Sequence, residues 1–375
     1  MAKGQGSLEV LELIPVSPFP DPSFWSGRRV LLTGHTGFKG SWLALWLLEL
    51  GAKVTGLALP PDTEPSLFSQ LELQSRLDHH IGDIRDAAAL TELVALTRPQ
   101  VVLHLAAQPL VRRSYDEPVA TWQANVMGTI HLLEALRRLE QPCTAVLITT
   151  DKVYRNNEWL YGYRENDPLG GHDPYSSSKA AAEIAIASWR SSFCGPLPHQ
   201  TPHLRIASAR AGNVIGGGDW AADRIVPDAM RALGCGIPIR VRNPHATRPW
   251  QHVLEPLSGY LSLAERLTAD PSLADAFNFG PQLEANRTVR ELVEEALQHW
   301  NGRWLDQSDP TAPHEASLLN LVVDKAHHQL QWAPRWNFAT TVERTVNWYR
   351  RIREQTGSAV ELCKDDLVAY RSAFL

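Results

Sequence analysis

Two short segments contain the side chains best suited to proton transfer. Tyr175 and Lys179 are four residues apart, a spacing that places both on one face of a helix. Because an ammonium group stabilises a phenolate, we expect Lys179 to lower the pKa of Tyr175, which then acts as a base toward a sugar or steroid hydroxyl. The second segment, Thr150-Asp151-Lys152, supplies a hydroxyl, a carboxyl and an amine in succession. A simple dehydrogenase does not need this second set, whereas an enzyme that eliminates water does.

A glycine-rich turn indicates where a dinucleotide binds. Gly34, Gly37 and Gly40 form a G-x-x-G-x-x-G pattern between a predicted strand at 28–33 and a predicted helix at 41–51. Glycines let the backbone approach a pyrophosphate, and the helix N-terminus supplies N–H groups. The alternative is a tight turn without a ligand. The pattern favours a cofactor site formed by Gly34, Thr36, Gly37, Phe38, Lys39 and Gly40.

The ends of the next two predicted strands bear on the choice between NAD and NADP. The second strand, 52–59, has no acidic residue at its tip for the ribose hydroxyls, but Asp62 follows shortly after. No arginine is found there for a 2′-phosphate, so we predict NAD. Asp83 and Ile84, which end a short predicted strand at 80–84, would lie beside the adenine. The alternative for Asp83 is a plain aspartate at a strand end.

The elements that must position these residues alternate between strand and helix. Further apolar strands are predicted at 101–106 and 145–149, and helices at 87–96 and 115–139. Strands that are apolar along their whole length and alternate with helices predict a Rossmann-type, doubly wound parallel sheet of the α/β class. Beyond residue 160 the pattern is less regular, with a helix at 176–191, a strand at 205–211 and a helix at 289–300. We therefore predict a tail at 1–24, an NAD-binding domain at 25–211, and a smaller, non-contiguous substrate lobe at 212–375 that partly returns to the first domain.

Bulk properties exclude several classes of protein. The chain has 375 residues and a net charge of −5, which provides no electrostatic footprint for nucleic acid. No segment approaches the roughly 18 consecutive apolar residues that a membrane helix needs, and the first twenty residues do not resemble a signal peptide. Four cysteines lack metal-type spacing and fit a reducing compartment. These features predict a cytoplasmic protein without a metal, a nucleic-acid partner or a membrane partner.

Several motifs, in order, resemble the extended short-chain dehydrogenase/reductase superfamily over about residues 25–348. They are the TGHTGFKG turn, the HLAAQ strand end, Tyr175 with Lys179, and the segment 210–214. Thr150-Asp151-Lys152 resembles the Thr-Asp-Glu signature of its sugar-nucleotide 4,6-dehydratases, with lysine in place of glutamate. That replacement, together with segments 106–115, 212–228 and 242–261, is similar to the CDP-glucose 4,6-dehydratase branch.

This resemblance implies a substrate, a cofactor and an assembly. The substrate would be CDP-D-glucose and the product CDP-4-dehydro-6-deoxy-D-glucose, on the route to deoxy sugars of cell-surface polysaccharides such as O-antigen. A tightly held NAD would be reduced and reoxidised within one turnover. A homodimer through the helices at 115–139 and 176–191, or a homotetramer, is also expected.

The chemistry assigns a role to each acid/base residue. Tyr175 would take the proton of the 4-hydroxyl, aligned by Thr150, while Lys179 also bonds the nicotinamide ribose. Asp151 would protonate the departing 6-hydroxyl, which requires burial to raise its pKa. Lys152 would remove the C5 proton as a neutral amine; if charged, it could only stabilise an enolate. Alternatively, Thr150 only caps backbone, and Asp151 and Lys152 form a plain ion pair.

The remaining candidates rest largely on the resemblance. His104 and His252 lie in apolar contexts and are expected to be core or hydrogen-bonded histidines. For each arginine, a surface role is the alternative. Further cofactor contacts are expected from Leu105, Ala106, Ala107 and Thr149, and substrate contacts from Gln108, Arg112, Asn213, Asp219, Trp220, Arg224, Arg242 and Arg248, with Arg248 on the pyrophosphate.

Other functions are compatible with parts of the pattern. A nucleotide-sugar 4-epimerase or decarboxylase would share the glycine turn, Tyr175 and Lys179, but would leave Asp151 and Lys152 idle. A nucleotide-sensing regulator on the same scaffold would tolerate loss of Tyr175 or Lys179, and both are present. A 4,6-dehydratase for another nucleotide sugar also remains open.

Overall fold

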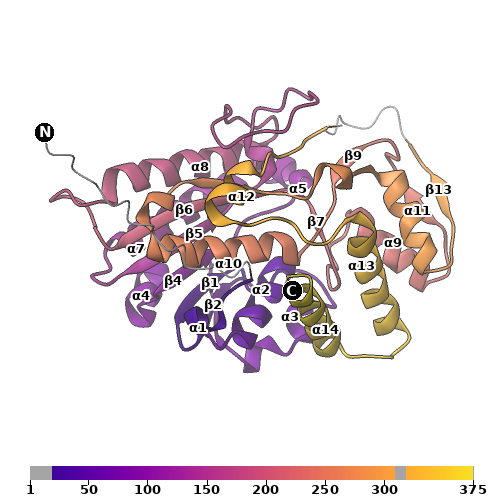
Figure 1. Ribbon diagram of the computed structural model, residues 1–375, viewed down its shortest axis with the longest axis horizontal. Coiled ribbons are helices and arrows are strands. Elements are labelled where there is room, and N and C mark those ends of the chain that lie inside the picture. The colour runs from indigo at the N-terminus through magenta and orange to yellow at the C-terminus, as the bar shows by residue number, and fades with distance from the viewer. Residues whose placement is uncertain (1–18, 309–317, 375) are drawn as a thin grey trace, which may run out of the picture.

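A seven-stranded parallel sheet forms the centre of the molecule (Figure 1). The computed structural model describes residues 19–308 and 318–374. The strand order is β11-β6-β5-β4-β1-β2-β3, so the order reverses between β1 and β4, where ligands bind in doubly wound sheets. The predicted fold class is therefore confirmed. The strands are β1 (Arg29–Thr33), β2 (Lys53–Ala58), β3 (Asp78–Ile81), β4 (Val101–His104), β5 (Cys143–Ile148), β6 (Leu204–Ala211) and β11 (Ala276–Phe279).

Helices cover both faces of this sheet. Leu31 and Leu32 are neighbours on β1, yet Leu31 packs among buried residues of α4 and α7, and Leu32 among those of α2 and α10. This alternation is the expected consequence of the two-residue period of a strand. One face is covered by α2 (Phe38–Glu49), α10 (Leu254–Ala269) and α14 (Ala359–Ser372), and the other by α4 (Ala87–Thr97), α7 (Gly128–Arg137) and α8 (Pro174–Phe193).

Two predicted elements differ from the structure. The strand expected at 80–84 is β3 at Asp78–Ile81, because pairing with β2 places Thr55 opposite Asp78 and Ala58 opposite Ile81. The single helix expected at 115–139 is a series of shorter ones. Pro118 begins a new helix, and a π-helical turn follows it. The series is α5 (Val111–Asp116), α6 (Pro118–Trp122), η2 (Gln123–Met127) and α7.

A smaller lobe is formed mainly after β6, and Figure 1 shows α9, α11 and β13 together at one end of the molecule. The chain then returns to the sheet through α10 and β11, which pairs with β6. The elements of the lobe and its return are β7 (Val214–Ile215), α9 (Ile225–Gly234), β8 (Ile239–Val241), β9 (Thr247–Pro249), β10 (Gln251–His252), η4 (Pro271–Leu273), η5 (Leu283–Ala285), β12 (Asn286–Thr288), α11 (Val289–His299), β13 (Trp304–Asp306), α12 (Asp324–Leu330) and α13 (Phe338–Arg353).

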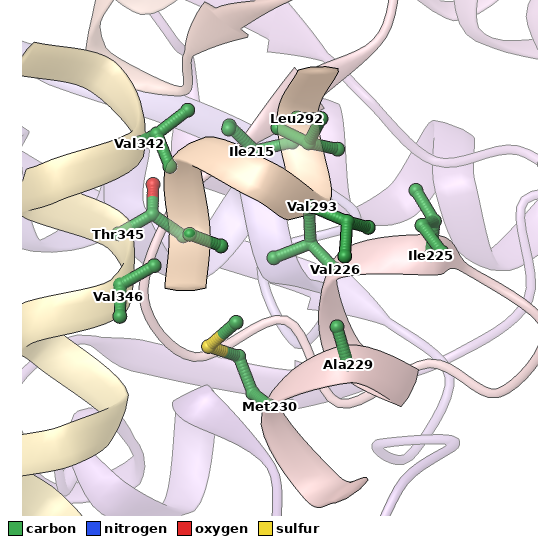
Figure 2. A pocket seen from close by; sticks show the side chains of 11 residues that line it. Ile215, Ile225, Val226, Ala229, Met230, Leu292, Val293, Val342, Thr345 and Val346 are labelled. Carbon is green, nitrogen blue, oxygen red and sulfur yellow. The ribbon is translucent and has the colours of Figure 1, made fainter. Parts of the chain in front are cut away.

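A small cavity between α9, α11 and α13 belongs to the packing of this lobe. Figure 2 shows aliphatic side chains converging on it, with the hydroxyl of Thr345 as a polar exception. Its volume of about 10 Å³ is at most that of one water molecule. It is therefore a packing defect of the lobe's core and is too small to be a ligand site.

The segment before the first strand also packs on the core. Residues 1–18 of the expected tail lie outside the described residues. Within the remainder, α1 (Pro22–Trp25) buries Trp25, whose indole donates to Glu265 at 2.5 Å, and the ring of Phe19 lies 5.7 Å from that of Trp46. Residues 19–24 therefore already pack on the core. The remaining short elements are α3 (Leu67–Gln70), η1 (Leu73–Ser75) and η3 (Asp151–Val153).

Candidate active site

The glycine turn after β1 is built around two close backbone approaches. Gly34 has a φ of +79°, and a Cβ there would lie 2.7 Å from the amide nitrogen of Ala106, in the loop after β4. A Cβ on Gly40 would lie 2.0 Å from the carbonyl oxygen of Gly34. Thr36 donates its hydroxyl to the carbonyl of Leu59, after β2. The turn thus holds the N-terminus of α2 at the carboxyl end of the central strand β1, as a pyrophosphate site requires.

Lys39, in the first turn of α2, points into the protein. Its Nζ donates to the hydroxyl of Tyr260 at 2.9 Å; Tyr260 is fully buried and Lys39 is half-buried. Burial lowers the pKa of Lys39 to about 7; the charges of Lys179 and Arg224 act in the same direction, and Asp151 opposes them. Lys39 is therefore part of the same electrostatic cluster as the predicted acid/base residues. The sequence gives no sign that Tyr260 belongs to the site, because a tyrosine inside an apolar helix has the same pattern as a core residue.

The Thr150-Asp151-Lys152 segment forms the one-turn helix η3 at the end of β5. Thr150 caps it: its hydroxyl accepts from the amide of Lys152 and donates to Asp151 Oδ1 at 2.9 Å. Asp151 is only 4% exposed, and burial raises its pKa although Lys152, Thr150 and Arg248 act to lower it. This direction is the one that an acid for the departing hydroxyl needs. Lys152 is half-buried.

Tyr175 and Lys179 lie in the first turns of α8, beside η3. The phenol of Tyr175 lies close enough to Thr150 for that hydroxyl to lower its pKa, and Lys179 Nζ donates to the carbonyl of Ile148 at 3.2 Å. The expectation that Lys179 lowers the pKa of Tyr175 is wrong for this structure. Burial raises the pKa of Tyr175 to about 12, opposed by Thr150, while burial lowers that of Lys179 to about 8. The cost of desolvating a phenolate outweighs the neighbouring charge.

Arg224 joins this cluster from the smaller lobe. It forms an ion pair with the buried Asp219 at 2.9 Å. Burial acts to lower the pKa of Arg224, but Asp219 outweighs it, and Tyr175 and Asp62 raise this pKa further. Asp62 itself is exposed. Asp219 is thus the partner of Arg224.

The segment after β6 borders Asp151. A Cβ on Gly212 would lie 2.9 Å from Asp151 Oδ2, and the exposed Asn213 follows directly. Arg248, whose Nη1 donates to the carbonyl of Thr247, is close enough for its charge to lower the pKa of Asp151. Asn213 and Arg248 therefore flank the acid.

Two other predicted arginines converge at the surface. Arg112, from α5, and Arg242, after β8, both reach the same carboxylate oxygen of Asp223, at 3.3 and 3.1 Å. All three side chains are at least half exposed. A single anionic oxygen is thus contacted by guanidinium groups from both parts of the chain.

Some predicted contacts are occupied by bonds within the protein. Gln108 uses its amide to bond Leu110 and Thr121. The indole of Trp220 donates to Gln70, and its ring packs edge-on against Tyr349. Both side chains hold loops in place.

At the β3 end, Asp83 pairs with Arg85, which lowers its pKa, and both line an open groove of about 540 Å³. Ile84 is buried against Gly128, and Leu105 and Ala107 are half-buried in the loop after β4. Asp83 is therefore accessible in the groove, whereas the side chain of Ile84 contributes to the core.

The two histidines are core residues, as expected. His104 lies between the hydroxyls of Thr33, at 2.7 Å, and Thr129, at 3.2 Å, and burial lowers its pKa to about 3. His252 is fully buried, and burial also lowers its pKa to about 3. In residues 19–308 and 318–374, no group of three or more His, Cys, Asp or Glu side chains is arranged to hold a metal ion. No helix of the same residues has the length and hydropathy of a membrane span.

Comparisons with known proteins agree with this geometry. Residues 31–345 match the family model described as GDP-mannose 4,6 dehydratase. A CDP-glucose 4,6-dehydratase of Salmonella typhimurium is 49% identical over 333 residues, which are 88% of this chain and 92% of the relative. A dTDP-glucose 4,6-dehydratase of Xanthomonas campestris is 27% identical over 85% of this chain and 92% of its own.

Solved structures show the same fold at lower identity. The dTDP-glucose 4,6-dehydratase DesIV of Streptomyces venezuelae, solved with NAD bound, superposes with a TM-score of 0.72 at 24% identity, covering 87% of this chain and 98% of that one. A UDP-glucose 4-epimerase of Thermotoga maritima gives 0.71 at 20% identity, covering 86% and 99%.

Proposed function

We propose, from the premise that the chain belongs to the GDP-mannose 4,6-dehydratase family, that it dehydrates CDP-D-glucose to CDP-4-dehydro-6-deoxy-D-glucose and water. The observation that carries the proposal is the placement of the buried Asp151, whose pKa burial raises, beside Thr150, whose hydroxyl bonds Asp151 and also acts on the phenol of Tyr175. An oxidation site and an acid for a leaving hydroxyl thus lie side by side at the end of β5.

The residues present fit an NAD molecule. The turn at Gly34, Gly37 and Gly40 has room for backbone approach but not for added side chains at Gly34 and Gly40, and α2 begins there. We assign further contacts to Thr36, Phe38, Lys39, Asp62, Asp83, Ala106 and Thr149, with Ile84 supporting the adenine end from the core. The chemistry that bound NAD supplies is acceptance of a hydride from C4 of the sugar and its return at C6.

Tyr175, Thr150 and Lys179 serve the oxidation. Tyr175 Oη receives the proton of the 4-hydroxyl, and Thr150, which acts on the same phenol, orients the 4-oxygen. Because burial raises the pKa of Tyr175 to about 12, the basic form needs positive charge nearby, and Arg224 acts in that direction. Lys179 Nζ is held at the end of β5, and we assign it to the nicotinamide ribose.

Asp151 and Lys152 serve the elimination. Once C4 is a ketone, the C5 proton is acidic, and loss of the 6-hydroxyl requires that a proton reach it. Asp151 Oδ is assigned as the donor because burial raises its pKa. Lys152, on the same one-turn helix, is assigned to the C5 proton.

Arginines from both parts of the chain are assigned to the diphosphate. Arg112 and Arg242 meet on one oxygen of Asp223, an arrangement that a phosphate oxygen could adopt by displacing the carboxylate. Arg224 and Arg248 lie closer to Tyr175 and Asp151 and border the sugar end, together with Asn213. Asp219 orients Arg224, and Trp220 and Gln108 hold the surrounding loops.

We place the enzyme in the cytoplasm as a homodimer or homotetramer. Each of the four cysteines lies among the described residues, and each is unpaired, which fits a reducing compartment.

The experiment that tests the function is turnover of a panel of CDP-, dTDP-, GDP- and UDP-sugars, with keto-sugar absorbance in alkali as the readout. CDP-glucose is expected to give the keto sugar without net NADH. Asp151→Asn preserves shape but has no proton to give, so it should still reduce NAD while losing about 10²-fold or more of turnover. Formation of the C4 epimer, steady accumulation of NADH by the unaltered enzyme, or preference for another nucleotide would overturn the assignment.

A further inference from the structure

A buried ion pair behind the active site has no part in the chemistry just described. Glu183, on α8, and Arg210, on β6, are joined at 2.7 Å, and their side chains are 3% and 5% exposed. Replacing a buried ion pair by apolar side chains is often neutral or stabilising, so its presence is weak evidence for a role in stability. The position of its partners shows what else it does.

Glu183 ties the helix of Tyr175 to the strand end that precedes Thr150. It lies eight residues after Tyr175 and four after Lys179 on α8. Its Oε1 accepts from the hydroxyl of Thr149 at 2.5 Å, and its Oε2 accepts from Ser208 at 2.8 Å and from Arg210. Since Tyr175 and Glu183 both lie on α8, the Thr149–Glu183 bond links the helix of the phenol to the strand end that precedes Thr150.

Arg210 holds the other end of the same short helix. Its Nη1 donates to the hydroxyl of Tyr154, which directly follows η3, and to the carbonyl of Glu165, each at 2.9 Å. The hydroxyl of Tyr154 also donates to Asn278 at 2.7 Å. The ion pair is therefore bonded to the residue before Thr150 and to the residue after Val153. The turn that carries Asp151 and Lys152 is fastened on both sides.

We propose that Glu183 is a positioning residue, which with Arg210 clamps both flanks of the Thr150–Val153 turn and so sets the distance between that turn and Tyr175. The proposal rests on the dehydratase function proposed above. Its consequence is that bonds of Glu183 leading to the turn matter for turnover, whereas its bond to Ser208, in the middle of β6, matters only for folding. The carboxylate also opposes the lowering of the pKa of Lys179 by burial.

The test compares two hydroxyls that bond the same carboxylate. Thr149→Val removes the bond to the turn, Thr149→Ser keeps it, and Ser208→Ala removes the bond to β6. All three are assayed with CDP-glucose for kcat and KM, and by thermal unfolding. A displaced reacting group costs rate steeply, so Thr149→Val should lower kcat at least about tenfold with KM changed less than about threefold. Thr149→Ser should recover most of kcat, and Ser208→Ala should keep it.

The outcomes separate the clamp from the function. If the unaltered enzyme forms no keto sugar from CDP-glucose, the proposed function fails before the variants are compared. If it does, and Thr149→Val retains full kcat, or Ser208→Ala loses as much kcat as Thr149→Val at equal loss of melting temperature, the clamp is wrong. Should Thr149→Val fail to fold, Tyr154→Phe tests the other flank: the clamp requires a lower kcat at similar KM, and an unchanged kcat rejects it.

Discussion

Burial of charge is the dominant feature of individual residues in this site. Lys39 is half-buried and Lys179 is buried, and burial lowers the pKa of each, to about 7 and about 8. The same effect raises the pKa of Tyr175 and Asp151. For Asp151 this direction matches the role predicted from the sequence, whereas for Tyr175 it is opposite. The spacing of Tyr175 and Lys179 along the chain predicts that they are neighbours, but it does not predict how deeply they are buried.

Lys39 gives a prediction about stability and pH. In the unfolded chain a lysine keeps its proton up to about pH 10.5, whereas in the fold Lys39 loses it near pH 7. Between these values the unfolded chain binds more protons, so stability rises with pH. Lys39→Met removes this contribution. We compare the unfolding free energy of Lys39→Met with that of the unaltered protein. The difference, variant minus unaltered, should be largest at or below pH 7. It should decrease by about 2 kcal/mol by pH 9, because the unaltered protein becomes more stable over that range.

Urea unfolding of NAD-free protein at several pH values measures this difference. Lys53→Met, which alters an exposed lysine on β2, is the control and should show no such dependence. An advantage of Lys39→Met that stays constant from pH 7 to pH 9 would contradict the burial argument. Because the comparison concerns the slope with pH, loss of the Lys39–Tyr260 hydrogen bond does not obscure it.

At the scale of elements, some helices and strands follow from local sequence patterns, and others depend on tertiary contacts. The path from β1 through the glycine turn into α2 was predictable because periodicity and glycine spacing are local. The register of β3 was not, since it depends on pairing with β2. The break at Pro118 could have been read from that residue, but the π-helical turn after it has no local signature. Likewise, Tyr260 joins the site only because α10 packs back on the sheet.

The glycine turn provides a prediction that separates packing from cofactor binding. A Cβ on Gly40 would lie 2.0 Å from a backbone oxygen, which cannot move without displacing α2. Gly40→Ala should therefore reduce the unfolding free energy by about 1–3 kcal/mol or more. At Gly37 the nearest atom would be 3.6 Å away, an ordinary contact. Gly37→Ala should keep the stability of the NAD-free protein and weaken NAD binding, as seen by titration. Equal stability of the two variants would refute the packing role of Gly40.

At the scale of the whole molecule, the site lies where the two parts of the chain meet. The sheet contributes the glycine turn, the end of β5 and the start of α8, and the smaller lobe contributes Arg224 and Arg242. The alternation of strands and helices predicted the first part. The way in which β11 rejoins the sheet beside β6 follows from long-range pairing, and the sequence indicated only that some return occurs.

The helices that lead to and include α8 leave a stripe of large apolar side chains exposed. Tyr115, on α5, and Val119 and Trp122, on α6, are 60%, 69% and 40% exposed. Ile184, on α8, is 61% exposed, and α8 packs against α5, α6 and η2. Neighbouring exposed apolar side chains of this size mark an interaction surface. We therefore predict a two-fold dimer in which this face meets its own copy.

Charge placed on this face should separate the subunits. In Val119→Lys/Ile184→Lys each lysine would be brought against a copy of itself or of its neighbour across the two-fold axis, where like charges repel and desolvation is costly. Light scattering coupled to size exclusion should show the mass of two chains, or of four, falling to that of a smaller assembly. Leu96→Lys, on α4 and 74% exposed, is the control and should not alter the mass. A monomeric unaltered protein, or a double variant whose mass is unchanged, would show that the stripe does not hold subunits together.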